Sequence, residues 1–253
     1  MVVGRAVDVF EPVRAVAARA GIFTDFDGTL SGIVDDPDDA RPLDGVPVLL
    51  EALAARYAVV AVLSGRPVAF LQAHLPSSIV LSGLYGLEVV RHGAREDHPS
   101  GGIWREVVDD VSTLARASGP AGMRVESKGL SITLHYRGHP EIEDDVRRVA
   151  TQQAARSGLV VRPARMSFEL HPPIEADKGT ALRELAGGLD AVCFLGDDVG
   201  DLPAFRALDD LARDGVVTVR VAVRSEEAPE ELLDAADLVV DGPEGARDAL
   251  ASL

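Results

Sequence analysis

Two aspartates separated by one residue lie near the start of the chain, and carboxylates so placed could act together in acid, base or nucleophilic chemistry. The short segment 22–24 leads into Asp25, and Asp27 follows two residues later with Gly28 after it. In an open parallel sheet, ligands bind beyond the carboxyl ends of the strands, so we expect both carboxylates to project toward a site. There Asp25 could attack a phosphorus atom to form an aspartyl phosphate. Asp27 could protonate the leaving oxygen and then deprotonate the incoming water.

This Asp-x-Asp-Gly segment has two other possible interpretations. It could be a polar turn without chemistry, which stays open when the segment is taken alone. It could also begin a calcium-binding loop, but such a loop requires Glu at its twelfth position, where this chain has Asp36. The calcium interpretation is therefore disfavoured.

A second acidic cluster follows the apolar run 191–195. Asp197, Asp198 and Asp201 are crowded into the next six residues, where they would repel one another without a bound cation. Capping of a following helix at 202–210 explains one of these acids but not all three. Because carboxylate oxygens next to a phosphate favour Mg²⁺, we expect Mg²⁺ as the cofactor.

A carboxylate that approaches a phosphate needs positive charge nearby, since one such charge pair at 4 Å costs about 4 kcal/mol at an effective dielectric near 20. Lys178 is one candidate, because it stands at the expected start of a helix, where a bound anion explains a cation better than stability does. A solvated surface lysine is the alternative. Ser64, Gly65 and Arg66 follow the apolar run 57–63 and offer a hydroxyl and loop amides to a phosphoryl oxygen.

Strands and helices that could carry these residues alternate along most of the chain. Short apolar runs bounded by glycine or polar turns predict strands buried on both faces: 57–63, 191–195 and 216–221. Apolar residues at helical spacing predict helices between them: 5–19, ended by Gly21, then 45–56, 178–187 and 229–236. This alternation predicts an α/β fold with a parallel sheet.

A middle segment follows a different pattern. Helices are expected over 103–118 and 140–157, and residues 130–137 and 165–171 alternate between apolar and polar. Alternation of this kind predicts an antiparallel sheet with one packed face and one open face. We therefore predict an α/β core of residues 1–94 and 174–253, interrupted by a smaller α+β insert of residues 95–173.

Charge and cysteine content limit the classes of partner. With 25 Lys and Arg against 41 Asp and Glu, the net charge is −16, which disfavours binding to nucleic acid or to an anionic membrane. The single cysteine, Cys193, cannot form an intrachain disulfide, and no apolar run approaches the roughly 18 residues of a membrane helix. We expect a cytoplasmic protein that is a monomer or a weak homo-oligomer and acts on a small substrate.

Taken in order along the chain, these residues resemble the haloacid dehalogenase-like superfamily over residues 22–241. The resemblance implies a Rossmann-like core with an inserted cap that determines specificity. It also implies roles for the matching residues: Asp25 as nucleophile, Asp27 as general acid and base, Ser64 and Lys178 as phosphate contacts, and Asp25, the Asp27 carbonyl and Asp197 as ligands to Mg²⁺. With the rest of the acidic pair, the predicted metal ligands are Asp25, Asp27, Asp197 and Asp198, and Gly65 and Arg66 are predicted to bind the substrate.

Shorter segments resemble the trehalose-6-phosphate phosphatase family: 84–88, 125–129, 134–137, 168–173 and 177–182. This resemblance implies hydrolysis of trehalose 6-phosphate to trehalose and phosphate, with Glu126, Lys128 and Glu169 of the cap binding the glucose unit distal to the phosphate. The chain departs from the family at Gly200, where Thr is usual, and at Leu202, where Glu is usual, which bears on metal affinity. Two alternatives stay open: another sugar phosphate as substrate, or a non-catalytic protein that binds sugar phosphates.

Overall fold

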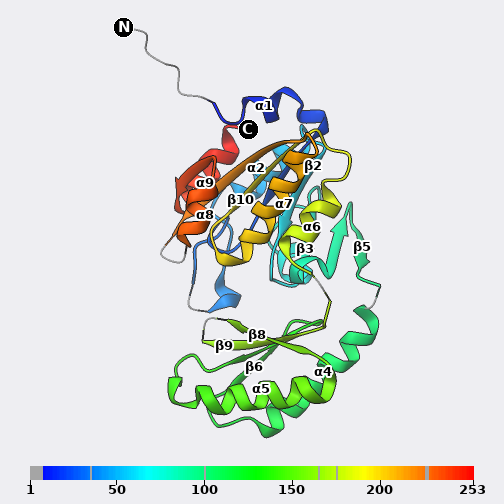
Figure 1. Ribbon diagram of the computed structural model, residues 1–253, viewed down its shortest axis with the longest axis vertical. Coiled ribbons are helices and arrows are strands. Elements are labelled where there is room, and N and C mark those ends of the chain that lie inside the picture. Colours follow the sequence, from blue (N-terminus) through cyan, green and yellow to red (C-terminus); the bar gives the residue numbers. More distant parts are fainter. Residues whose placement is uncertain (1–7, 35, 100, 165, 175, 226–227) are drawn as a thin grey trace. The chain divides into compact units, whose positions relative to one another are not determined.

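The computed structural model describes residues 8–34, 36–99, 101–164, 166–174, 176–225 and 228–253. These residues divide into two compact units, each with its own sheet and apolar core (Figure 1). Unit 1 holds the described residues of Met1–Glu96 and Ala176–Leu253, and unit 2 holds those of Asp97–Glu175.

Unit 1 is built on an eight-stranded sheet with the order β12-β11-β10-β1-β2-β3-β4-β5. Six of its strands pair in parallel: β1 (Ala20–Thr24), β2 (Val59–Leu63), β3 (Val80–Gly83), β10 (Ala191–Gly196), β11 (Val217–Arg224) and β12 (Leu238–Asp241). At one end, β4 (Glu88–Arg91) runs antiparallel to β3, and β5 (Ala94–Asp97) forms the edge. The predicted parallel α/β architecture is confirmed.

Helices cover both faces of this sheet, which is why its central strands are apolar throughout. In β1, Ile22 belongs to one buried cluster and the next residue, Phe23, to the other. The first cluster includes residues of α2 (Val46–Ala54), α3 (Val68–Gln72) and α9 (Gly242–Ala251). The second includes residues of α6 (Lys178–Leu185), α7 (Leu202–Arg213) and α8 (Glu230–Ala235).

None of the helices in the described residues combines the length and the apolar character that a membrane-spanning segment needs.

The beginning of the chain differs from the prediction of a helix over 5–19. The structure has a short helix α1 (Glu11–Ala15) and a 3-10 turn (Ala17–Arg19), and residues 5–7 lie outside the described residues. Gly21 does not end a helix but lies inside β1. A Cβ at this position would lie 2.5 Å from the Phe23 ring and 2.6 Å from Leu189 Cδ1, so a side chain here would have to displace both of these groups.

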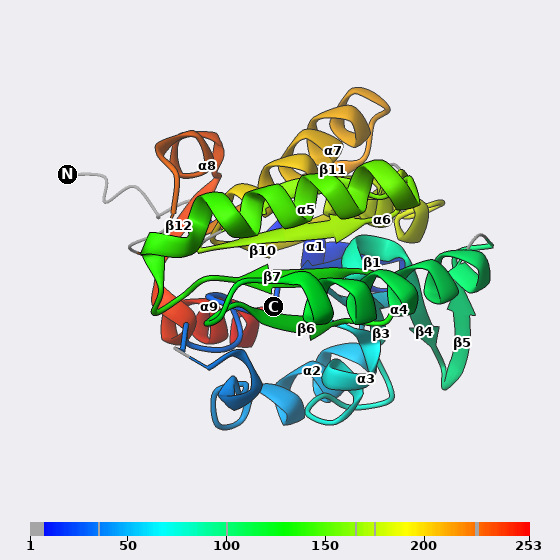
Figure 2. The same cartoon turned by 90° about the horizontal axis from the view of Figure 1, so that it is seen from below.

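Unit 2 pairs two helices with a four-stranded antiparallel sheet of order β6-β7-β9-β8. Its elements are α4 (Gly101–Ser118), β6 (Arg124–Ser127), β7 (Ile132–His135), α5 (Glu143–Ser157), β8 (Val160–Ala164) and β9 (Ser167–His171). Figure 2 shows α4 and α5 side by side across one face of this sheet. Apolar residues of both helices form a buried cluster with Ile132, Leu134, Phe168 and Leu170.

The other face of this sheet is polar, as the alternation predicts, but it is not open. Residues that pair directly across strands share a face, and Thr133 pairs with Glu126 on one side and Glu169 on the other. Thr133 is 3% exposed and Glu169 is 7% exposed, so the expectation of a solvent-exposed polar face is wrong at its centre. Hydrogen bonding replaces water for part of this row, since Ser131 Oγ donates to Glu169 Oε1 at 2.8 Å.

Candidate active site

The carboxyl ends of β1 and β10 bring the two acidic segments together. These strands are parallel neighbours with Thr24 opposite Leu195, and the Asp25 amide continues the pairing by donating to the Leu195 carbonyl at 2.9 Å. Asp25 is therefore the first residue beyond β1, and Asp197 is the first residue beyond β10. Residues 172 positions apart in the chain thus reach the same end of the sheet, where ligands bind in this class of fold.

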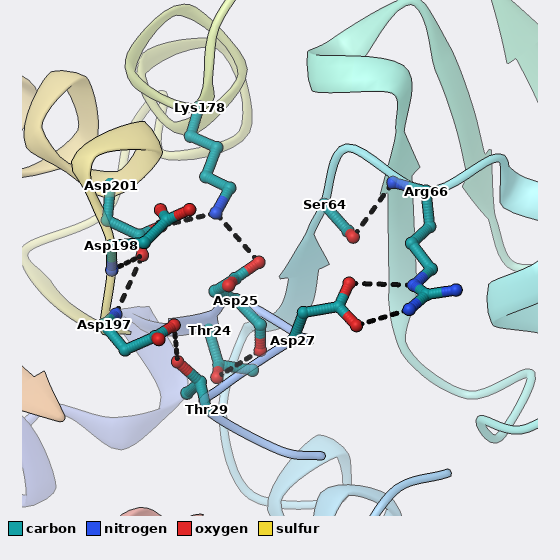
Figure 3. Close-up of polar contacts among 10 residues, drawn as sticks. All are labelled: Thr24, Asp25, Asp27, Thr29, Ser64, Arg66, Lys178, Asp197, Asp198 and Asp201. Carbon is teal, nitrogen blue, oxygen red and sulfur yellow. Dashed lines mark hydrogen bonds and ion pairs between the residues drawn. The ribbon is translucent and has the colours of Figure 1, made fainter. Parts of the chain in front are cut away.

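Gly28 allows the loop after β1 to pass directly against Asp197. Its φ of +77° lies in the left-handed region, and a Cβ there would lie 2.0 Å from Asp197 Oδ2. The next residue, Thr29, donates from Oγ1 to Asp197 Oδ1 at 3.3 Å (Figure 3). The small residue and the hydroxyl together fix the position of the Asp197 carboxylate.

Lys178 lies between two buried carboxylates. Its Nζ is 2.8 Å from Asp25 Oδ1 and 2.6 Å from Asp201 Oδ1 (Figure 3), and its side chain is 4% exposed. A capping box holds the start of α6 in place, because Asp177 Oδ1 accepts from the Thr180 amide and Thr180 Oγ1 accepts from the Asp177 amide. Two ion pairs therefore explain this cation at a helix start, and the alternative of a solvated surface lysine is wrong.

The sequence analysis placed Asp201 in the acidic cluster near a cation but did not predict its role in holding the site. It is fully buried, its Oδ1 accepts from Lys178, and its Oδ2 accepts from the amides of Asp197 at 2.8 Å and Asp198 at 3.1 Å. Asp201 thus holds the loop that carries Asp197 and fixes Lys178 at the same time. Its position four residues after Asp197, at the start of a predicted helix, was the available signal.

Burial and crowding shift the proton affinities of these groups. Burial raises the pKa of Asp25 well above its usual value, against the opposing effect of Lys178. Burial raises the pKa of Asp197 to about 7, and the neighbouring carboxylates of Asp201 and Asp198 add to the rise. The pKa of Asp201 is also raised by burial. For Lys178, burial acts to lower the pKa, but the carboxylates of Asp201 and Asp25 prevail and raise it well above its usual value.

The donor set fits a hard divalent cation. Within the described part of the chain, Asp25, Asp197 and Asp201 form a group whose ligand oxygens lie within 4.8 Å of one another. Asp201 accepts three hydrogen bonds at 2.6 to 3.1 Å, whereas Asp197 accepts two long ones, from Thr29 at 3.3 Å and Ser225 at 3.4 Å, so Asp25 and Asp197 are the better ligands. Asp198 is exposed and lies outside this group, so its role as a ligand stays a prediction. Leu202 is 8% exposed in an apolar cluster, so it gives the site no polar group where the family usually has Glu.

Asp27 is held by a guanidinium rather than by Lys178. Arg66 donates from Nε to Asp27 Oδ2 at 2.8 Å and from Nη2 to Asp27 Oδ1 at 2.6 Å (Figure 3). The guanidinium also lies 4.2 Å from the ring centroid of Phe70, which fixes its plane. Ser64 is 1% exposed and its Oγ accepts from the Arg66 amide at 3.1 Å, so the loop after β2 is held next to Asp27.

The predicted sugar contacts lie on or beside the polar face of unit 2. Glu126 of β6 has its Oε2 2.8 Å from His135 Nε2, and Glu169 of β9 accepts from Ser131. Lys128 follows β6, and its amide donates to the Ser131 carbonyl at 2.8 Å. Two carboxylates and an ammonium group next to one sheet are suited to the hydroxyls of a sugar.

The sequence is similar to that of a known family over most of its length. A model of the family described as Trehalose-phosphatase matches residues 23–236. A trehalose-phosphate phosphatase of Mycobacterium ulcerans (strain Agy99) is 34% identical over 210 residues, which are 78% of this chain and 53% of that protein. A trehalose-phosphate phosphatase of Mycobacterium avium (strain 104) is 35% identical over 209 residues, which are 74% of this chain and 51% of that protein. The chain thus spans about half the length of these curated relatives.

Solved structures with the same fold include the crystal structure of a trehalose-6-phosphate phosphatase related protein. It has a TM-score of 0.75 at 23% identity, over 92% of this chain and 96% of that one. At 23% identity the likeness shows the fold alone. The same fold is found in the crystal structure of a haloacid dehalogenase-like hydrolase from Bacteroides thetaiotaomicron, with a TM-score of 0.60 at 16% identity over 92% of this chain and 98% of that one, as the sequence analysis predicted.

Proposed function

The chain belongs to the trehalose-phosphatase family, and from that premise we propose that it hydrolyses trehalose 6-phosphate to trehalose and phosphate. One observation carries the proposal most strongly. The carboxylate of Asp25 lies at the end of a central strand, 4% exposed and next to the Lys178 cation. Such an arrangement suits a nucleophile for phosphoryl transfer, because the cation offsets the repulsion between the carboxylate and the phosphate.

In the proposed reaction, an oxygen of Asp25 forms a bond to phosphorus as the bond between phosphorus and the sugar oxygen breaks. Once Arg66 has released it and it has taken up a proton from solvent, the carboxyl group of Asp27 gives that proton to the leaving oxygen, and trehalose is released. Asp27 then accepts a proton from the water whose oxygen attacks phosphorus. The bond between phosphorus and the Asp25 oxygen breaks, which frees inorganic phosphate and returns the Asp25 carboxylate. Lys178 remains next to Asp25 through both steps.

The loop after β2 is proposed to hold the phosphate through the Ser64 hydroxyl, the Gly65 amide and the Arg66 guanidinium. A phosphoryl oxygen that takes over the guanidinium would release Asp27 for proton transfer. This exchange would connect arrival of the substrate with availability of the acid.

We propose Mg²⁺ as the cofactor, held by the carboxylates of Asp25 and Asp197 and by the Asp27 carbonyl. When bound, it would supply charge neutralisation for the phosphoryl group. Asp201 is a positioning residue here, since it holds the loop that carries Asp197.

The sugar is proposed to bind through Glu126, Lys128 and Glu169, whose charged groups accept from and donate to hydroxyls. A cytoplasmic location, and a monomeric or weakly oligomeric state without nucleic-acid or membrane partners, complete the proposal.

The test is release of inorganic phosphate from a panel of sugar phosphates, with Mg²⁺ and with EDTA. We expect trehalose 6-phosphate to be the preferred substrate, with activity lost in EDTA and in Asp25→Asn. A matched control is Asp214→Asn, which changes an exposed aspartate after α7 and should retain full activity. Better turnover of another sugar phosphate would contradict the assignment of trehalose 6-phosphate as the substrate. Retained activity in Asp25→Asn would contradict the covalent mechanism. If no sugar phosphate releases phosphate, the protein binds sugar phosphates without hydrolysing them.

A further inference from the structure

We propose that Thr133 is a further specificity-determining residue, whose hydroxyl hydrogen-bonds to a hydroxyl of the bound sugar. This inference rests on the proposed function and deepens it, because it adds a neutral contact to the charged residues that resemblance assigns to the sugar. It depends on the position of Thr133 in the sheet of unit 2 and on the unsatisfied state of its side chain.

Thr133 lies between the two carboxylates proposed to bind the sugar. It pairs directly with Glu126 of β6 on one side and with Glu169 of β9 on the other. Directly paired residues of antiparallel strands project their side chains from the same face, with Cβ atoms about 5 Å apart. The three side chains therefore form one row, and a ligand that touches both carboxylates must pass over Thr133.

The Thr133 hydroxyl has no hydrogen-bond partner within the described part of the chain. The residue is 3% exposed, so bulk water does not satisfy the hydroxyl either. A buried hydroxyl without a partner is uncommon in native structures and calls for an explanation. Its two neighbours in the row do have hydrogen-bond partners: Glu126 Oε2 is hydrogen-bonded to His135 Nε2, and Glu169 Oε1 accepts a hydrogen bond from Ser131 Oγ.

A sugar hydroxyl matches the unused hydrogen-bonding capacity of this row. The threonine hydroxyl can donate and accept, a sugar hydroxyl can do the same, and the flanking carboxylates only accept. A polyol lying across the row could thus donate to a carboxylate and exchange a hydrogen bond with Thr133. An apolar ligand would leave Thr133 unsatisfied, so the row selects for hydroxyl-bearing ligands.

The chain offers a matched control in Ser112 of α4. Its hydroxyl is also buried and without a partner among the described residues, and Ser112 is 2% exposed. It lies in the helix layer that packs on the apolar face of the sheet, with Val108 and Val111 of the same helix in the buried cluster. If an unsatisfied hydroxyl mattered only for folding, the two positions would respond alike.

The experiment measures kcat and KM of the full chain for trehalose 6-phosphate and for p-nitrophenyl phosphate, a phosphate ester without a sugar. In Thr133→Val, which keeps the shape of the side chain, we expect the ratio of kcat/KM between the two substrates to fall about tenfold, mainly through KM for the sugar phosphate. Thr133→Ser keeps the hydroxyl and should restore the ratio to within about twofold of wild type. Ser112→Ala should leave both substrates unaffected.

Unfolding in urea provides the second measurement. Removal of an unsatisfied buried hydroxyl should leave the stability of Thr133→Val equal to or above that of wild type, so the change in the ratio cannot come from misfolding. An unchanged ratio in Thr133→Val overturns the inference, as does a lowered ratio that serine fails to restore. Wild-type protein that hydrolyses p-nitrophenyl phosphate but not trehalose 6-phosphate overturns the proposed function, and the inference falls with it.

Discussion

The buried carboxylates at the end of β1 and β10 make the metal-free protein sensitive to pH. Asp197 is 1% exposed, and burial raises its pKa from 3.8 to about 7. Between these two values the folded chain keeps a proton that the unfolded chain has released. The stability contributed by this proton is complete below pH 3.8 and is lost as the pH rises through about 7.

The size of this effect follows from the pKa change. One pKa unit is worth about 1.36 kcal/mol, so the rise from 3.8 to about 7 corresponds to about 4 kcal/mol, of which about 3 kcal/mol is lost between pH 5 and pH 8. Asp25 and Asp201 act in the same direction, because burial raises their pKa values as well. We therefore expect the metal-free protein to lose stability as the site becomes ionised.

Mg²⁺ should reverse this loss. The cation binds deprotonated carboxylates, so it competes with protons at the site and stabilises the folded state more at pH 8 than at pH 5. At a concentration one hundred times its dissociation constant, a ligand that binds only the folded state adds about 2.7 kcal/mol. Most of the stability that ionisation of Asp197 removes would then return at pH 8.

The assay is urea unfolding at pH 5 and pH 8, with EDTA or with Mg²⁺, for wild type and for Asp197→Asn. Because asparagine does not titrate, comparison with this variant measures the contribution of Asp197 together with the effect of its charge on the pKa of Asp25. In EDTA the wild type should lose about 3 kcal/mol relative to the variant between the two pH values. If both proteins change in parallel, or if Mg²⁺ stabilises them equally at both pH values, the assignment of Asp197 as a buried, metal-binding carboxylate is wrong.

Three substitutions test other parts of the site. Lys178→Met leaves the buried carboxylates of Asp25 and Asp201 without their cation and should lower the free energy of unfolding in urea by about 3–5 kcal/mol. If the variant is as stable as the wild type, the ion pairs do not form. Gly28→Ala places a methyl group 2.0 Å from Asp197 Oδ2. This variant should lower kcat by about a hundredfold or more, because a small misplacement of a catalytic group has an effect of that order, and should weaken Mg²⁺ binding measured by calorimetry. Normal Mg²⁺ binding would contradict the close packing of Gly28 against Asp197. Arg66→Lys loses the two-pronged contact with Asp27 and should lower kcat about tenfold, so unchanged kinetics would remove Arg66 from the proposed mechanism.

The α/β core could be predicted because its strands are buried on both faces. Runs such as 191–195 are apolar at every position, and this pattern can be recognised in the sequence without knowing which residues lie next to the run in space. The helix expected over 5–19 was wrong in extent at its start because a proline fits the first turn of a helix and not its interior, so α1 begins at Glu11, next to Pro12. The place of Gly21 inside β1 was missed because local spacing does not show its packing next to Leu189. Contacts with residues far along the chain decided that position.

The expected open face of the insert shows the same limit. Alternation in 130–137 correctly separated an apolar from a polar side, because the strand period alone determines which residues share a face. Whether the polar side meets solvent depends on what surrounds it, and the structure buries Thr133 and Glu169 there. The register that places these two residues side by side is likewise a property of strand pairing rather than of the strand.

The sequence by itself determined which residues carry chemistry: carboxylates in an Asp-x-Asp segment, an acidic cluster and a lysine at a helix start each indicate phosphate or metal through their local composition. Only the tertiary structure decided how they are paired. It placed Lys178 between Asp25 and Asp201 and paired Asp27 with Arg66. The physical reason is that strand register and side-chain rotamers bring together groups more than a hundred residues apart, and the low dielectric of the buried site then fixes which charges neutralise one another.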